Sequence, residues 1–308
     1  MAAAVVAARR RAGRAGHPVP AAAGGPRQHG SRRVSPGAGD VVTRTLEAAG
    51  SPVAEYVIDP SLDRSLSPRP FLHPVRTLGG VVLTEMVPDD HRHHLGLSLA
   101  IADLDGTTFW GGRTFVAGRG PTPLDNHGVQ RHDGFRPASP SSIAEDLTWL
   151  TRTGEPLVRE TRTIEATDAG RPGAWTLTWT STLTNVAGRG LRVASPAVNG
   201  RPGAGYGGIF WRVASDAAAH TVTVAEGGGE QVAHGSTSPW LLLTGRTAAG
   251  RTWSLLFSRP GTDPWFVRMS GYVGAGPALA WSRPLVLAAE TALERQLTVV
   301  VADGELTP

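Results

Sequence analysis

Residues 175–180 read Trp-Thr-Leu-Thr-Trp-Thr, and this stretch decides the fold class. In an extended chain Trp175, Leu177, Trp179 and Leu183 fall on one side, whereas threonines occupy the other side. A strict period of two with aromatic and β-branched residues is typical of a strand buried on one face. The segment therefore predicts a half-buried β-strand.

The same alternation recurs along the chain, while helical periodicity is nearly absent. Leucines and an isoleucine alternate over residues 95–101, and Asp105-Gly106 supplies a tight turn before residues 107–110. Two further hairpins are predicted, from residues 143–152 with 157–165 and from 240–246 with 252–258, and a last strand covers 293–301. Many short strands between Gly, Pro and Asp turns predict an all-β fold, a large antiparallel β-sandwich with very little helix.

The charge of the chain is concentrated at its start. All 30 basic residues are arginines, and eight of them lie in the first fifty residues beside only two acids. We therefore expect a disordered leader rich in Arg, Ala, Gly and Pro over residues 1–39, followed by one β-sandwich domain over residues 40–308. The remaining residues have a slight acidic excess, so nucleic acid is not an expected partner.

Several other classes are excluded by composition. The chain has no cysteine, which rules out disulfide scaffolds and thiolate metal sites. Its longest apolar runs fall far short of the roughly 18 to 20 residues of a membrane span. In the leader an alanine-rich run precedes the arginines, the reverse of a secretory signal. We therefore expect a cytoplasmic protein without a membrane partner.

The densest polar cluster occupies residues 89–94, which read Asp-Asp-His-Arg-His-His and lead into the strand of residues 95–101. If that strand begins at His91, then His91 and His93 project to one face and His94 to the other. Two imidazoles spaced in this way suit half of a metal site or an acid/base pair. The alternative is a polar loop of solvated histidines.

Two further groups combine histidine or charge with a defined setting. His127 and His132 fall in a stretch rich in glycine that is predicted as a loop, and the neighbouring Asp133 suits orientation of the His132 imidazole. Glu160 and Arg162 share the face of apolar strand residues, where an unpaired charge is costly. They are expected to pair with each other, to line a polar cleft, or to be solvated on an edge strand.

A glycine-rich loop at residues 203–208 leads into the strand segment Ile-Phe-Trp-Arg. Tyr206 and Trp211 could stack on a sugar ring, and Arg212 could reach its hydroxyl groups; for Trp211 a place in the core is the alternative. The chain lacks the G-x-G-x-x-G, G-x-S-x-G and H-E-x-x-H patterns. Dinucleotide binding and the two corresponding hydrolase types are therefore unsupported.

Several separated segments resemble one bacterial family, known as methane oxygenase PmoA-like. They are residues 69–77 (Arg-Pro-Phe-Leu-His-Pro-Val-Arg-Thr), 90–97, 109–111 and 205–212, and the resemblance covers about Val53 to Gly304. It adds His73 to the candidate site. The membrane subunit behind that name is a bundle of spanning helices, and this sequence predicts strands, so we do not infer methane chemistry.

A second resemblance concerns the fold. Residues 284–291, Pro-Leu-Val-Leu-Ala-Ala-Glu-Thr, look like the closing segment of galactose-mutarotase-like supersandwiches. This resemblance implies a large β-sandwich that binds a carbohydrate. It also implies acid/base catalysis of the mutarotase or epimerase type, in which a histidine protonates the ring oxygen and Glu160, or less favourably Glu290, takes a proton.

Two other functions compete with this one, so the sequence does not decide whether the chain is an enzyme. One is a metal-dependent oxygenase or lyase, with a divalent ion on His91, His93 and either His127 or Asp90; no other cofactor is expected. The other is a non-catalytic sugar-binding module. The sequence does not predict the oligomeric state.

We expect all candidate residues to meet on one concave face. The predicted catalytic residues are His91, His93, His94 and Glu160, and the predicted substrate-binding residues are His73, His127, His132, Arg162, Tyr206, Trp211 and Arg212.

Overall fold

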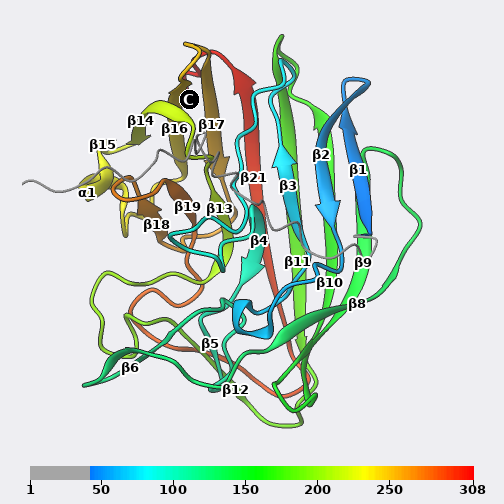
Figure 1. The fold of residues 1–308 in the computed structure, drawn as a ribbon, viewed down its shortest axis with the longest axis vertical. Coiled ribbons are helices and arrows are strands. Elements are labelled where there is room, and N and C mark those ends of the chain that lie inside the picture. The colour runs from blue at the N-terminus through cyan, green and yellow to red at the C-terminus, as the bar shows by residue number, and fades with distance from the viewer. Residues whose placement is uncertain (1–41) are drawn as a thin grey trace, which may run out of the picture. The chain divides into compact units, whose positions relative to one another are not determined.

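The computed structural model describes residues 42–308 and shows two large antiparallel sheets that pack face to face (Figure 1). The predicted leader over residues 1–39 lies outside the described residues. One sheet has seven strands, in the order β1 (Thr43–Ala48), β2 (Ser51–Val57), β3 (Phe71–Val75), β4 (Leu97–Ala100), β13 (Gly208–Arg212), β19 (Gly274–Pro277) and β18 (Trp265–Arg268).

The second sheet has nine strands and packs behind the first in the view of Figure 1. Their order is β15 (Gly227–Gly228), β14 (Ala217–Val224), β16 (Trp240–Thr247), β17 (Thr252–Ser258), β21 (Ala292–Asp303), β11 (Ala174–Asn185), β10 (Pro156–Asp168), β9 (Ser142–Leu150) and β8 (Val129–Phe135).

Small elements complete the described part of the chain. A three-stranded sheet has the order β20 (Leu285–Leu287), β12 (Leu191–Ala194) and β5 (Asp103–Leu104), and β6 (Thr114–Val116) pairs with β7 (Gly120–Thr122). Within residues 42–308, helix is limited to one 3₁₀ turn, η1 (Arg64–Leu66), and to α1 (Glu230–Ala233). No helix within residues 42–308 has the length and apolar character needed to cross a membrane.

The predicted fold class is confirmed, because the paired strands of both large sheets run antiparallel. The segment of residues 175–180 lies within β11, where Trp175, Leu177 and Trp179 are fully buried. The hairpins β9–β10 and β16–β17 and the last strand β21 also occur where the alternation predicts them. Asp105 and Gly106 do form a turn, with φ values of 51° and 87°, but only a single bridge from Leu104 to Thr107 follows it.

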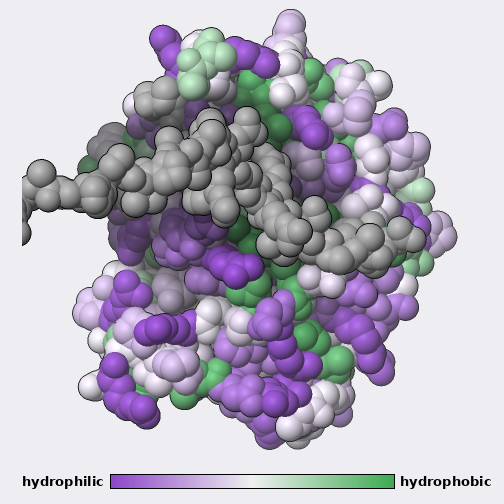
Figure 2. Space-filling view, viewed as in Figure 1, coloured by the Kyte–Doolittle hydropathy of each residue, from purple (hydrophilic) through white to green (hydrophobic). Residues whose placement is uncertain are grey.

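Apolar residues from the facing sides of the two sheets form one core. Trp211 and Leu99 enter it from the seven-stranded sheet, and Trp175 and Trp179 enter it from the nine-stranded sheet. On the surface shown in Figure 2, hydrophilic residues dominate the lower part of the described region, with hydrophobic residues showing between them. The molecule thus places its apolar side chains mainly between the sheets.

A charged group lies inside this core. Arg162 on β10 is fully buried and donates two hydrogen bonds to Glu160, at 2.7 Å from Nε to Oε1 and 2.8 Å from Nη2 to Oε2. Glu145 on β9, which faces Arg162 in the strand register, lies 3.5 Å from its Nη1. Of the settings predicted for Glu160 and Arg162, the structure shows their mutual pairing, in the core and not in a cleft.

The same group joins the two sheets. Tyr56 on β2 accepts a hydrogen bond from Arg162 Nη1 at 2.7 Å and donates its hydroxyl proton to Glu145. Gln130 on β8 accepts from Arg162 Nη2 at 3.0 Å and donates to the carbonyl of Leu99 on β4 at 2.8 Å. These bonds connect specific positions of the facing sheets, so they fix how one sheet lies on the other.

Replacement of Arg162 by methionine is expected to lower the free energy of unfolding by about 3–5 kcal/mol, because it leaves the buried carboxylates without their cation. Arg159→Met removes an exposed arginine of the same strand and should change stability by less than about 0.5 kcal/mol. Urea unfolding monitored by tryptophan fluorescence measures both. A loss below about 1 kcal/mol for Arg162→Met would show that the group does not stabilise the fold.

Candidate functional site

The outer face of the seven-stranded sheet presents a second cluster of aromatic side chains. Along β13, Ile209 and Trp211 point into the core, whereas Phe210 and Arg212 point to the opposite face. Phe210 packs there with Phe266 of β18 and with Trp110. Strand alternation therefore separates two neighbouring candidates: Trp211 belongs to the core, where its Nε1 donates to the carbonyl of Leu83 at 2.8 Å, and Arg212 belongs to the outer face.

A pocket of about 440 Å³, here called the histidine pocket, opens on this outer face. Its polar side chains are Asp90, His91, His93, His94, Arg113, Arg201 and Arg268. Its aromatic side chains are Trp110, Tyr206, Phe266 and Tyr272.

The three histidines reach this pocket through turns rather than through a strand. The His91 amide donates to the carbonyl of Pro88 at 3.1 Å, and the His94 amide donates to the carbonyl of His91 at 2.8 Å. The imidazole centroids lie 4.7 Å apart for His91 and His94, 4.8 Å for His93 and His94, and 5.7 Å for His91 and His93. The strand β4 begins at Leu97 and not at His91, so the condition under which His94 would face away from His91 and His93 is not met.

Arg212 lies against the histidines and is 3% exposed. Its Nη2 donates to Glu85 Oε2 at 2.9 Å and to Asp90 Oδ1 at 3.3 Å, and its guanidinium carbon lies 4.6 Å from the centroid of the Tyr272 ring. Its Nη1 lies 3.3 Å from His94 Nδ1. Because a guanidinium only donates, Nδ1 of His94 is the acceptor and the proton of this imidazole is on Nε2.

Burial keeps His93 and His94 neutral at pH 7. It lowers the pKa of His93 to about 3, with a further contribution from the charge of Arg69. It also lowers the pKa of His94 far below its usual range, and the neighbouring imidazoles and Arg212 add to this effect. Burial raises the pKa of Tyr272 to about 12, so its hydroxyl stays protonated. The inner wall of the pocket is thus made of neutral groups that donate and accept hydrogen bonds.

Asp90 and His91 form a pair at the rim of the pocket. His91 Nδ1 lies 2.8 Å from Asp90 Oδ2, and both side chains are partly exposed. Partial burial opposes ionisation of Asp90, but the hydrogen bond from His91 and the charge of Arg212 prevail and lower its pKa. A carboxylate that orients an accessible imidazole is suited to proton transfer.

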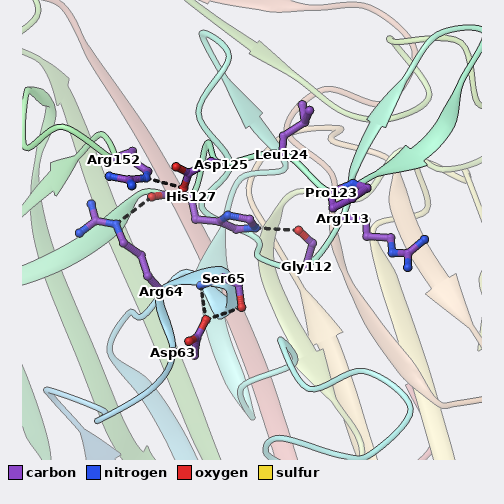
Figure 3. Close-up of a pocket in the computed structure, with 10 residues that line it drawn as sticks. All are labelled: Asp63, Arg64, Ser65, Gly112, Arg113, Pro123, Leu124, Asp125, His127 and Arg152. Carbon is purple, nitrogen blue, oxygen red and sulfur yellow. Dashed lines mark hydrogen bonds and ion pairs between the residues drawn. The ribbon is translucent and has the colours of Figure 1, made fainter.

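The remaining predicted residues lie elsewhere, so the expectation of one common face is wrong. Glu160 and Arg162 are in the core. His132 lies on strand β8 and not in the predicted loop, and its Nδ1 bonds Glu145 at 2.6 Å and not the predicted Asp133. His73 Nδ1 lies 3.0 Å from Thr84 Oγ1. His127 donates from Nε2 to the carbonyl of Gly112 at 2.7 Å and lines a neighbouring pocket (Figure 3). Of the predicted residues, the histidine pocket contains His91, His93, His94 and Tyr206, with Arg212 bonded to it.

Sequence reasoning did not single out several residues that shape this site. Tyr272, Arg201 and Arg268 line the pocket, and the alternation of Trp265 and Val267 with Phe266 and Arg268 could have placed Arg268 on the outer face. Arg69 begins the segment of residues 69–77 that carries the family resemblance, but it was not a candidate site residue. Its buried guanidinium donates to the carbonyls of His93 at 3.0 Å and Trp110 at 3.3 Å, and so fixes two walls of the pocket.

The predicted metal set does not assemble. Within residues 42–308 no group of three or more His, Asp or Glu side chains is placed to hold a metal ion. His127 lines a different pocket from His91 and His93, and Nδ1 of His91 and of His94 already face Asp90 and Arg212. The donors that the sequence predicts for a divalent ion are therefore not arranged as a metal site in the described residues.

The lowered histidine pKa values predict a pH-dependent stability. In the unfolded chain both histidines have an ordinary pKa near 6.5, so they become protonated below this pH. In the folded chain His93 and His94 stay neutral there, so the unfolded state binds more protons than the folded state. The free energy of unfolding should therefore fall as the pH drops below about 6.5. Each such histidine contributes about 1.4 kcal/mol per pH unit once the pH is well below that value.

Urea unfolding between pH 5.5 and pH 4.5 tests this dependence. His93→Gln should reduce the slope of the unfolding free energy against pH by about 1.4 kcal/mol per pH unit relative to the wild type. The reason is that the unfolded variant has one histidine fewer to protonate. An identical slope in the variant would show that His93 titrates normally in the folded chain.

No curated protein matches the sequence. Among solved structures it is similar to the GH36 α-galactosidase AgaA from Geobacillus stearothermophilus, with 11% identity and a TM-score of 0.41. The match covers 85% of this chain and 41% of that one, so the chain spans less than half the length of that enzyme. The family of unknown function DUF6807 matches residues 43–308, and the chain therefore belongs to this family.

Proposed function

We propose that the chain binds a sugar in the histidine pocket and transfers a proton on it through the Asp90–His91 pair. The observation that supports this most is the combination of aromatic walls with neutral imidazoles in one pocket. The resemblances to PmoA-like proteins and to galactose mutarotases remain predictions from the sequence, and the proposal does not depend on them.

The aromatic walls suit the apolar faces of a sugar ring. Trp110 and Tyr206 lie with their ring centroids 4.7 Å apart, and Tyr206 lies 5.5 Å from Phe266. The parts of these rings that line the pocket are apolar, and the C–H groups of a pyranose can pack against them. A volume of about 440 Å³ is within the range of small-molecule sites and is large enough for one sugar unit.

The neutral imidazoles suit the hydroxyl groups. A hydroxyl both donates and accepts, and a neutral imidazole has one nitrogen of each kind. His94 offers Nε2–H because its Nδ1 accepts from Arg212. If His93 and His94 were protonated, their ring nitrogens could only donate hydrogen bonds, and their charges would repel the neighbouring arginines.

The proton-transfer step is assigned to His91 and no longer to a glutamate. The oxygens of Glu160 are occupied by Arg162, by Trp149 Nε1 at 2.8 Å and by Ser181 Oγ at 2.6 Å, all within the core. Glu290 is exposed and does not line the pocket. His91 is accessible and is oriented by Asp90.

In anomer interconversion, His91 would take the proton of the anomeric hydroxyl. It would return this proton to the ring oxygen as the bond between C1 and that oxygen breaks, which gives the open-chain aldehyde and leaves the protein unchanged. Ring closure on the other face of the aldehyde reverses these steps. The Nε2–H of His94 is suited to hydrogen-bond the ring oxygen meanwhile.

A thermal-shift screen of monosaccharides tests binding. A sugar at about 100 times its Kd should add roughly 2.7 kcal/mol to the stability of the folded state. Tyr206→Ala should abolish the shift by removing an aromatic wall, whereas Tyr56→Phe, a tyrosine change in the core, should retain it. Absence of any stabilising sugar would contradict the proposal.

Anomer interconversion of a stabilising sugar, followed by NMR, tests the proton-transfer step. His91→Ala should slow the catalysed rate by about 10²-fold or more while Kd changes little, because His91 acts on the proton. His220→Ala, a histidine of β14 that does not line the pocket, is the control. Tight binding without any acceleration by the wild type would instead favour the non-catalytic sugar-binding module.

A further inference from the structure

A second pocket, of about 690 Å³ and drawn in Figure 3, shares lining residues with the histidine pocket. Gly112 and Arg113 line both pockets, so the two pockets are neighbours at this point. The side chains of Asp63, Arg64, Leu124, Asp125, His127 and Arg152 line the rest of the second pocket.

The backbone between the two pockets, here called the ridge, consists of Gly111 and Gly112. Gly111 and Gly112 have φ values of 92° and 73°, which favour glycine. A Cβ atom on Gly112 would lie 2.8 Å from His93 Nδ1, and one on Gly111 would lie 2.5 Å from the carbonyl oxygen of Leu66. A side chain at either position would collide with these neighbours, so the boundary between the two pockets at this point is formed by backbone alone.

Hydrogen bonds hold this ridge in place. The Gly112 amide donates to the carbonyl of Ser65 at 2.8 Å, and the Gly112 carbonyl accepts from His127 Nε2 at 2.7 Å. The Gly111 amide lies 3.4 Å from Thr108 Oγ1. The amides of both glycines are therefore occupied, and the ridge does not offer the free amide groups that typically bind a phosphate.

Arg113 is the charged residue shared by the two pockets. It is exposed, and no acidic partner faces it within residues 42–308. By contrast, Arg152 pairs with Asp125, and Arg64 donates to the carbonyls of Thr151 at 2.9 Å and His127 at 3.3 Å. In Figure 3, Arg113 lies on the opposite side of His127 from these two arginines.

The histidine pocket adds positive charge of its own. Arg201 lines it and also has no acidic partner in the described part of the chain, whereas Arg212 pairs with Glu85 and Asp90, and Arg268 with Glu230. Asp63 lines the second pocket without an ion pair in the described part of the chain, but Arg64, Arg113 and Arg201 also have none there, so positive charge is in excess at the two neighbouring pockets. A ligand with negative charge would complement it.

We propose that the ligand is an acidic oligosaccharide, whose chain crosses Gly111 and Gly112 and whose carboxylate pairs with Arg113. This inference rests on the proposed function and names its substrate class. One sugar unit occupies the histidine pocket, and the next units occupy the second pocket. A uronic acid fits better than a phosphorylated sugar, because a single planar guanidinium matches a carboxylate and the ridge amides are occupied.

Isothermal titration of the full chain tests the proposal with defined probes. Glucuronic, galacturonic and mannuronic acid are each compared with the corresponding trisaccharide, and a neutral hexose trisaccharide is the charge control. The acidic trisaccharide of the correct configuration should bind at least about 10-fold more tightly than its monosaccharide, since it reaches both pockets.

The variant Arg113→Ala should weaken binding of that acidic trisaccharide by about 10-fold and so remove its advantage over the neutral trisaccharide, which has no carboxylate to pair. Arg119→Ala, an exposed arginine of the β6–β7 turn that lines neither pocket, is the matched control and should change neither affinity.

Three results would overturn the proposal, and they can be told apart. Equal affinity for monosaccharide and trisaccharide would show that the second pocket takes no sugar, while the proposed function stands. Equal affinity for neutral and acidic trisaccharides, or no effect of Arg113→Ala, would show that no carboxylate is recognised. Failure of every sugar to bind would contradict the proposed function itself.

Discussion

The guanidinium of Arg212 is the group on which the geometry of the site depends. It contacts Glu85, Asp90, His94 and the Tyr272 ring at once, and these residues come from separate parts of the chain. Through Asp90 it also reaches His91, because the carboxylate that accepts from Arg212 orients that imidazole. Its position at the end of β13 places all of these groups beside the aromatic outer face of the sheet.

The sandwich uses a second buried arginine for a different purpose. Arg162 lies between the sheets with two carboxylates, a tyrosine and a glutamine, so its hydrogen bonds join the sheets and leave no group free for a ligand. Arg212 lies on the other side of the seven-stranded sheet, where its partners border a pocket. The rigid core thus supports an outer face whose loops bring together imidazoles, aromatic rings and arginines.

The sequence predicted the fold far better than the site. Alternation in β11 depends only on neighbours along one strand, so Trp175, Leu177 and Trp179 could be placed without a structure. The histidine segment was also recognised, but its turns depend on hydrogen bonds that the sequence pattern did not indicate. Placing Tyr272 or Arg201 beside it requires the order of strands in the sheet, which local patterns do not provide. Glu160 and Arg162 resembled site residues because a buried ion pair and a polar cleft have the same residue types.

Histidine NMR tests the central claim, that the imidazoles of His91, His93 and His94 form a sugar-binding pocket, most directly. Two-bond ¹H–¹⁵N spectra of the full chain at pH 7 report the tautomer and protonation state of each ring. The account predicts neutral His93 and His94, a proton on Nε2 of His94, and shifts confined to these three rings when a monosaccharide is added. A charged His94, or sugar-induced shifts at His132 or His220 with none at these three, would contradict it.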